Sequence, residues 1–287
     1  MNEKKQDVVK SNAFINSYLT GSLSVISHRL IYACLLQIRS KTEIFDHTKS
    51  FIIKGSELAD ITGRNSKDGY KSLMRAAKNL EGAGFRTKYL PDGGLLYPDS
   101  PDDFDWFAIV HRVRYRKGKG EVQINFAPDV IPYISQLKGN YTKMLKHNLI
   151  PMKSRYGMRL YELCISWLGT EREFSIDEFR KLFDVENKYK ALKDLKARVL
   201  KPALEDIHKY TDLRIKFGQV KSGRRVVAFQ FAITKRMIRE PGLNVQQFSN
   251  AYPRLTYGKS KLEVIEIMKA QEKREDQKEI FSLTDLN

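Results

Sequence analysis

The chain has 287 residues, of which 41% are hydrophobic, and this length suggests one to three domains with proper cores. Its 51 Lys and Arg against 34 Asp and Glu give a formal net charge of +17, which favours a polyanionic partner, nucleic acid before membrane. The longest apolar run, Leu30–Ile38, is far too short to span a membrane, and residues 1–7 do not resemble a secretion signal. We therefore expect a cytoplasmic protein in which Cys34 and Cys164 are reduced core residues.

About the first 60 residues are predicted to form helices and one short strand. Residues 8–38 have a helical pattern, with Ser24 or Ser27 as the cap of its main helix. A short apolar strand follows at 51–53, and Ser56 is expected to cap the next helix.

A basic helix and a hairpin complete this first group of elements. The helix is expected from Ser66 to Leu80, with a cationic stripe made of Lys67, Lys71, Arg75 and Lys78. After a polar stretch at 91–105, two alternating segments at 107–115 and 122–126 predict a hairpin with a Gly-rich turn at 116–120.

The segment 128–152 reads as a helical connector, and its prolines and Gly139 make it the expected domain boundary. A strongly periodic helix follows, with apolar residues at 160, 163, 164, 167 and 168. Residues 174–176 then form a predicted short strand that runs into another helix.

The segment 187–235 combines a helix and a hairpin with a cationic outer side. From Lys188 to Arg236 the chain has 14 Lys and Arg against 4 Asp and Glu, a local balance of +10. The helix places apolar residues on one face and Lys190, Lys193 and Lys201 on the other. The strands of the hairpin flank a basic turn at 221–225. A basic helix backed by a basic hairpin is what a winged helix offers to duplex DNA, although a basic helix face can also be merely solvated.

Pro202 lies inside this helical pattern and is expected to kink it, because proline cannot donate to the carbonyl of Arg198. The recognition part would then be Lys188–Lys201. The order helix, strand, helix, basic helix and hairpin occurs twice, at about 28–126 and 156–233. The fold predicted is therefore α+β, with two tandem winged helices related by pseudo-two-fold symmetry.

The expected domains are residues 8–135, residues 150–236 and a tail at 237–287. The tail has few apolar residues, so we expect partial disorder, with a short helix at Ser260–Lys273 whose apolar side carries Leu262 and Ile265.

The chain resembles the plasmid replication initiators that bind iterons, over roughly residues 8–236. The residues that carry the resemblance are Arg29–Leu35, Arg159-Leu160-Tyr161-Glu162-Leu163, Tyr189, Arg198, Leu200, Lys201, Gly223-Arg224 and Phe229. The resemblance implies two winged-helix domains, of which the second reads direct repeats in the origin and the first dimerises and adds weaker DNA contacts. It also implies that monomers initiate replication in a bacterial host, that dimers repress their own promoter at an inverted repeat, and that plasmid copy number is controlled in this way.

The predicted DNA contacts divide between the two domains. In the second domain they are Lys188, Tyr189, Lys190, Lys193, Lys196, Arg198, Lys201, Lys221, Arg224 and Arg225, and in the first domain they are Arg64, Asn65, Lys67, Lys71 and Arg75. Arg198 has an alternative role, because it lies four residues after Asp194 on the helix and could pair with it internally.

Enzymatic alternatives find little support in the residues. Gly258-Lys259-Ser260 looks like the end of a phosphate loop, but Pro253 stands where that loop needs glycine. The five histidines, at 28, 47, 111, 147 and 208, are scattered, whereas metal-dependent nicking needs paired ligands. Asp99, Asp102, Asp103 and Asp105 could hold a metal, but an acidic loop that repels misplaced phosphate is the preferred interpretation. We expect neither enzymatic activity nor a cofactor.

The expected partners are double-stranded DNA, a second copy of the chain, and host replication proteins such as the replicative helicase and the host initiator. A transcriptional repressor without initiator activity is the main alternative, since fold and charge cannot separate the two. In the tail, Gln277, Ile280 and Phe281 resemble the short peptide that docks on the bacterial sliding clamp, although so short a pattern also arises by accident.

Overall fold

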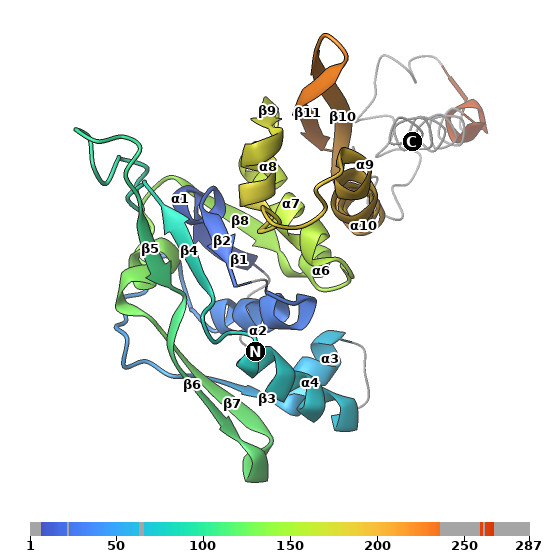
Figure 1. The fold of residues 1–287 in the computed structure, drawn as a ribbon. Coiled ribbons are helices and arrows are strands. Elements are labelled where there is room, and N and C mark those ends of the chain that lie inside the picture. The colour runs from blue at the N-terminus through green and yellow to red at the C-terminus, as the bar shows by residue number, and fades with distance from the viewer. Residues whose placement is uncertain (1–6, 22, 63–65, 236–258, 261, 267–287) are drawn as a thin grey trace.

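The structure is a computed structural model, and it describes residues 7–21, 23–62, 66–235, 259–260 and 262–266 (Figure 1). Two winged-helix modules follow one another along the chain, as predicted. Here the first module denotes the elements from β1 to α6, and the second module denotes those from α7 to β11.

The elements of the first module are β1 (Asp7–Ser11), α1 (Asn12–Ile15), β2 (Tyr18–Thr20), α2 (Val25–Leu36), β3 (Phe51–Lys54), α3 (Gly55–Thr62), α4 (Ser66–Lys78), β4 (Gly84–Thr87), β5 (Asp105–Ala108), β6 (Val110–Arg116), η1 (Lys117–Lys119) and β7 (Glu121–Phe126). The module closes with η2 (Pro128–Val130), α5 (Ile131–Ile134), β8 (Tyr141–Leu145) and α6 (Lys146–Leu149). Ser24 caps α2 by accepting a hydrogen bond from Ser27 N, so Ser24 rather than Ser27 is the cap.

The second module contains α7 (Arg155–Ser166), β9 (Glu171–Ser175), α8 (Ile176–Leu182), α9 (Leu192–Leu195), η3 (Lys196–Leu200), α10 (Lys201–Tyr210), β10 (Leu213–Ser222) and β11 (Arg225–Lys235). Its sheet has the order β10-β11-β9, and the first module has the matching sheet β6-β7-β3. In both sheets the return strand of the hairpin pairs with the short strand that precedes the helices. The predicted repeat of element order is therefore a repeat of topology.

Two sequence-based assignments are wrong, and both involve one strand pair. Residues 8–38 were expected to be helical, but the part before α2 forms β1, the single turn α1 and β2. The connector 128–152 was expected to be helical throughout, but it contains β8, which pairs with β1 and aligns Val8 with Met144. Local periodicity cannot identify a strand whose partner lies so far along the chain.

The predicted first hairpin is divided between two sheets. The strand expected at 107–115 is two strands, because β5 pairs with β4 and only β6 pairs with β7. The register between β6 and β7 shifts between Val110 and Arg112, which marks the irregularity where the chain leaves one sheet for the other.

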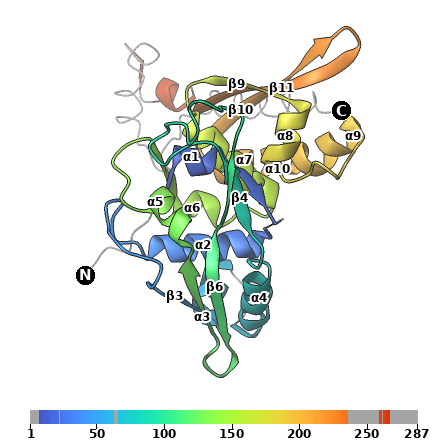
Figure 2. The same cartoon turned by 60° about the vertical axis from the view of Figure 1, so that its left-hand side comes forward.

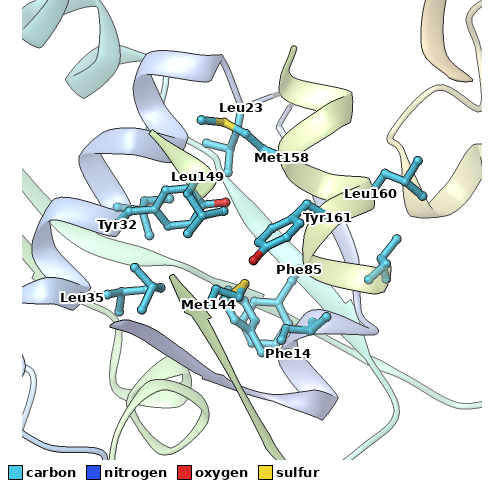
Figure 3. Close-up of a cluster of buried hydrophobic side chains, with 14 of the residues drawn as sticks. Phe14, Leu23, Tyr32, Leu35, Phe85, Met144, Leu149, Met158, Leu160 and Tyr161 are labelled. Carbon is cyan, nitrogen blue, oxygen red and sulfur yellow. The ribbon is translucent and has the colours of Figure 1, made fainter. Parts of the chain in front are cut away.

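One hydrophobic core runs through both modules. Figure 3 shows Tyr32 and Leu35 of α2 in the same cluster as Met158 and Tyr161 of α7, with Met144 of β8 between the two groups. Cys34 and Cys164 are buried free thiols in this core, as expected, and burial raises the pKa of both. Because α2 belongs to the first module and α7 to the second, the two modules share this core.

A buried ionic network joins the modules beside this core. The Glu162 carboxylate accepts hydrogen bonds from the ammonium of Lys10 and from Tyr32 Oη (2.9 Å), and Arg159 Nη1 lies 3.5 Å from its other oxygen. Lys10, Arg159 and Glu162 are each less than 5% exposed. Burial lowers the pKa of Lys10 despite the neighbouring carboxylate, and the adjacent cations lower the pKa of Glu162 to about 2 despite its burial.

Two buried arginines also link the modules reciprocally. Arg159 of α7 donates to the carbonyls of Ile15 (2.7 Å) and Ser17 (2.5 Å) in the first module. Arg29 of α2 donates to the carbonyls of Ile150 (2.7 Å) and Met152 (2.8 Å), which precede α7. Arg29 and Arg159 thus occupy equivalent positions, each being the fifth residue of its helix.

Helices α7 and α10 pack most closely at Gly157. A Cβ at Gly157 would lie 2.8 Å from Asp206 Cβ, and the Asp206 carboxylate accepts hydrogen bonds from the backbone N of Lys153 and Ser154 before α7.

We therefore expect Gly157→Ala to lower the free energy of unfolding by about 1–3 kcal/mol, since overpacking outweighs the helix propensity of alanine. Urea unfolding checks this. Gly118→Ala is the control, because a Cβ at Gly118 has no neighbour within 4 Å, and equal effects of the two variants would contradict the packing argument.

Candidate nucleic-acid interface

The recognition helix of the second module begins later than predicted. The helix was expected from Lys188, but α9 begins at Leu192, and Tyr189 has a left-handed backbone with φ 52°. The carbonyls of Lys188, Tyr189 and Lys190 all accept hydrogen bonds from the Arg180 guanidinium, which keeps these residues out of the helix. Residues 188–190 therefore form a structured loop in front of the helix.

Pro202 affects the helix as expected, but through a π-helical turn. The turn η3 directly precedes α10, and Lys201 N bonds to Lys196 O in the i→i−5 pattern. Pro202 then occupies the first turn of α10, where a missing N–H costs least. The buried side of α10, which includes Leu204 and Ile207, packs inward as predicted.

The structure places most of the predicted cations of the second module on its surface. The exposed ones are Lys188, Lys190, Lys193, Arg198, Lys201, Lys221, Arg224 and Arg225, whereas Tyr189 and Lys196 are half-buried. The opposite side of the helix is core, since Leu195 and Val199 are fully buried. The segment is thus amphipathic in the sense that the sequence predicts.

The hairpin β10–β11 carries the second group of these cations at its tip. Ser222 pairs with Arg225, so the chain reverses through Gly223 and Arg224, and Gly223 has φ 59°, which glycine adopts without strain. Lys190 and Arg225 line a hollow of about 400 Å³ between the hairpin, α8 and the start of α9. The loop and the hairpin tip therefore lie on either side of one groove.

Helix α4 is the counterpart in the first module. Leu73 and Ala77 of α4 are buried, and Lys71, Arg75 and Lys78 are exposed on the other side, as the basic stripe predicts. Arg64 and Asn65 lie outside the described residues, as does the side chain of Lys67.

The hairpin β6–β7 adds cations that the sequence reasoning omitted from the predicted site. Arg112, Arg114, Lys117 and Lys119 are exposed along β6 and at its tip. The signal was present, because this turn has the same basic, glycine-containing composition as the turn at 221–225. Both modules therefore present a basic helix and a basic hairpin.

The two basic helices share one side of the molecule. Figures 1 and 2 both place α4 and α9 on the same side, with the two hairpins projecting at opposite ends. Asp99, Asp102 and Asp103 belong to the loop before β5, and Asp105, the first residue of β5, accepts a hydrogen bond from Tyr97 Oη at Oδ1 (2.9 Å). Figure 1 shows this loop away from α4 and α9.

Arg198 has no carboxylate neighbour in the ion pairs that the structure records between described residues, so the alternative pairing with Asp194 is not formed. Both side chains are exposed. The guanidinium of Arg198 is therefore presented at the surface of η3.

The histidines form no metal site in the part of the chain that the structure describes. The histidines are less scattered than their positions suggest, because the rings of His47 and His111 lie 5.7 Å apart and His111 Nδ1 is bonded to the carbonyl of Phe126. Within the described ranges, no group of three His, Cys, Asp or Glu side chains is arranged to hold a metal ion.

Part of the tail is described. Residues 262–266 are helical, and Ser260 and Glu263 form a reciprocal cap, since Ser260 N donates to Glu263 Oε2 (2.8 Å) and Glu263 N to Ser260 Oγ (3.4 Å). The predicted apolar side is wrong at Leu262, which is 77% exposed, whereas Ile265 is half-buried and Val264 is the buried residue. Residues 267–273 of the predicted helix, the clamp-like residues Gln277, Ile280 and Phe281, and Pro253 and Gly258 lie outside the described residues.

Among the helices that the structure describes, none is long and apolar enough to cross a membrane.

Comparison with known proteins was made on both sequence and fold. Residues 7–165 match the family model described as Initiator Replication protein, WH1, and residues 175–233 match Initiator Rep protein, WH2. A "Replication initiation protein" of Escherichia coli is 30% identical over 141 residues, which cover 46% of this chain but only 43% of that protein. The "PI protein" of Escherichia coli is 25% identical over 261 residues, covering 80% of this chain and 84% of the relative.

The fold is similar to a crystal structure of Pi initiator protein in complex with iteron DNA. The TM-score is 0.64 at 20% sequence identity, with 82% of this chain and 100% of that chain covered. This likeness confirms the tandem winged-helix fold. Together with the family models, which account for more than half of its residues, it leads to one conclusion: this chain belongs to the family of replication initiator proteins built from a WH1 and a WH2 module.

Proposed function

We propose that the protein initiates plasmid replication by binding direct repeats, or iterons, in the origin as a monomer. The observation that carries the proposal is the placement of two basic helices, each with a basic hairpin, on one side of a single rigid core. The similarity of the fold to Pi initiator bound to iteron DNA supports it. Bound in this way, the protein opens adjacent AT-rich DNA and recruits the host replication proteins, and it needs no cofactor or enzymatic activity of its own.

The two kinds of basic element have different roles in this proposal. The exposed face of α9 and η3, with Lys193, Lys196 and Arg198, enters the major groove and reads bases. The loop at 188–190, Lys201 and the hairpin residues Lys221, Arg224 and Arg225 contact phosphates. In the first module the weaker contacts come from Lys67, Lys71 and Arg75 of α4 and from Arg64 and Asn65. Affinity then depends steeply on salt, with a log–log slope of about −0.9 per phosphate neutralised.

A nuclease footprint on the DNA flanking its own gene tests the proposal. We expect evenly spaced protected direct repeats whose centres lie about one or two helical turns apart. A lone protected inverted repeat would instead identify a transcriptional repressor without initiator activity. Strand breaks produced by the protein in supercoiled origin DNA would identify a nicking enzyme.

Arg198→Ala and Lys221→Ala should affect DNA binding differently. We expect Arg198→Ala to relax base preference, with a loss of about 1–3 kcal/mol of discrimination at one position of the repeat, because a surface guanidinium on the recognition helix reads base edges. Lys221→Ala should weaken all duplexes alike and reduce the salt slope by about 0.9, because it removes one phosphate contact. Fluorescence anisotropy with repeat and unrelated duplexes over a salt series measures both effects.

Each of these variants is the control for the other. Both remove one exposed cation from the same module, so a general charge effect would give them the same result. If the two variants kept the base preference and salt slope of the parent, the assignment of base and phosphate roles would be wrong.

We also propose that dimers, formed through the first module, repress the protein's own promoter at an inverted repeat. The interface would use the segments 107–115 and 122–126, in which β7 is the central strand of its sheet, so that β5 and β6 supply the free edges. Beside the β5 edge, Phe104 and Trp106 are 54% and 49% exposed. The Trp106 ring lies over Gly84, and its Nε1 donates to Thr20 Oγ1 (2.9 Å), so it is a rigid apolar contact. Sedimentation of the free protein tests this, and a monomer at every concentration would exclude it.

The remaining partners rest on the sequence alone. We propose that host replicative helicase and initiator bind the protein at the origin in the cytoplasm, and that Gln277, Ile280 and Phe281 dock on the sliding clamp. Capture of the clamp by a tail peptide, abolished by Ile280→Ala/Phe281→Ala, supports the last proposal, and equal capture by both peptides would remove it.

A further inference from the structure

Arg180 connects α8 to the start of the recognition helix. Its Nη1 donates to Lys188 O (2.7 Å), and its Nη2 donates to Tyr189 O (2.8 Å) and Lys190 O (3.0 Å). Three successive carbonyls therefore converge on one planar cation. The backbone carbonyl of Arg180 also accepts from Val185 N (3.0 Å), so the same residue holds both ends of the loop between α8 and α9.

Two further contacts support the loop, since Lys188 N donates to Val185 O (3.0 Å) and the Tyr189 side chain packs against the core. Tyr189 has φ 52°, a left-handed backbone that a residue with a side chain adopts only where its surroundings hold it. Ala191 is the N-cap of α9 and has no side chain that could accept a hydrogen bond from the first turn. The point at which α9 begins is therefore set by Arg180 rather than by the helix's own capping residue.

We infer that Arg180 is the positioning residue that places the recognition helix of the second module for base readout. This inference rests on the proposed DNA-binding function and adds a residue that was not among its predicted DNA contacts. The guanidinium is engaged by backbone carbonyls, so it acts through the loop and helix and not as a phosphate contact. A displaced helix start moves Lys190 and Leu192 relative to the hairpin residue Arg225 across the groove, which changes base readout more than it changes charge.

The variant that tests this is Arg180→Lys, which keeps the charge but cannot give the forked set of donors that three carbonyls need. Binding to a direct repeat should weaken about tenfold or more, whereas binding to an unrelated duplex should change less than about twofold. The salt slope should stay that of the parent, because the number of neutralised phosphates is unchanged. Arg172→Lys is the matched control, since Arg172 is an exposed arginine of the same module that stacks on Trp167, 5.7 Å from the ring centroid.

A second substitution that adds a capping side chain to α9 can distinguish a positioning role of Arg180 from its other possible roles. Ala191 has the extended backbone, φ −70° and ψ 134°, that a capping serine adopts. Ala191→Ser in the Arg180→Lys background should therefore recover at least about threefold of the lost affinity for the repeat. Hydrogen exchange should show faster exchange in Arg180→Lys at amides 188–195 and unchanged exchange in β10 and β11.

Several results would overturn the inference. The inference fails if Arg180→Lys binds the repeat as tightly as the parent does. It also fails if Arg180→Lys weakens binding to all duplexes equally and has a shallower salt slope, because Arg180 would then be a phosphate contact. A fall in melting temperature of more than about 5 °C would assign Arg180 to general stability instead. If the parent protects no repeats, the proposed function fails, and the inference is then decided by exchange at amides 188–195, where parent-like rates in the variant would refute it.

Discussion

Replacing Glu162 by glutamine should lower the free energy of unfolding by about 3–5 kcal/mol, the largest single effect that we expect in this protein. The carboxylate is 1% exposed and is the shared acceptor of Lys10, Tyr32 and Arg159. Glutamine keeps the shape but removes the charge, so two buried cations would remain without their counter-ion. A buried ion pair is weak support for stability while intact, but its disruption is costly.

The effect should reach both modules, because the network lies between them. Lys10 belongs to β1, Tyr32 to α2, and Arg159 binds carbonyls of the α1 region from α7. We expect urea unfolding of Glu162→Gln, followed by circular dichroism, to remain a single transition at lower urea if the modules unfold together. A split into two transitions would show that the ionic network is what couples them.

Glu186→Gln is the matched control. Glu186 pairs with Arg86 at 3.3 Å, but its side chain is 36% exposed, and a surface pair of this kind contributes at most about 1 kcal/mol. Equal losses in the two variants would contradict the argument from burial.

The low pKa of Glu162, about 2, adds a second expectation. Its stabilisation is fully present above the unfolded-state pKa of about 4.3 and is lost as pH falls towards 2.

Elements with local determinants were predictable from the sequence. Apolar residues three and four apart predicted α4 and α7, and strict alternation around a glycine turn predicted the β10–β11 hairpin, because in each case one face packs on the core. The strands β1 and β8 were missed, since their stability comes from pairing with each other across the whole first module.

In the candidate site, too, features with local determinants were predictable and features that depend on distant residues were not. Exposure of Lys193 and Arg198 followed from helical periodicity alone. The start of the helix did not, because it depends on three carbonyl contacts from Arg180, a residue on another helix. Likewise, Arg159 and Glu162 were recognised as a family signature, but their burial between the modules depends on Lys10, far away in the sequence.

The protein should lose stability as the pH falls from about 6.5 to about 4, through His28. His28 is 5% exposed, and burial lowers its pKa to about 4, with Lys10, Arg159 and Arg155 adding to this effect and Glu162 opposing it. The unfolded chain has a histidine pKa of about 6.5, so in this interval the unfolded state binds a proton that the folded state excludes. Stability is therefore complete above about pH 6.5 and declines by about 3 kcal/mol towards pH 4.

Two carboxyl groups act in the opposite direction at the acid end of this interval. Burial raises the pKa of Asp206 and Glu178, so the folded state binds protons there before the unfolded state does. The histidine effect is thus best isolated between about pH 5 and 6.5, above the range where carboxylates titrate in unfolded chains.

Urea unfolding at several values between about pH 5 and 7.5 measures the effect, with His28→Gln as the test variant and His147→Gln as the control. His147 is exposed on α6, so its replacement should leave the pH dependence as in the parent. His28→Gln should flatten the dependence, because glutamine fills much of the same space without a titratable group. A parent whose stability is constant from pH 7 to 5 would contradict this prediction, because it would show that the folded and unfolded proteins bind the His28 proton equally.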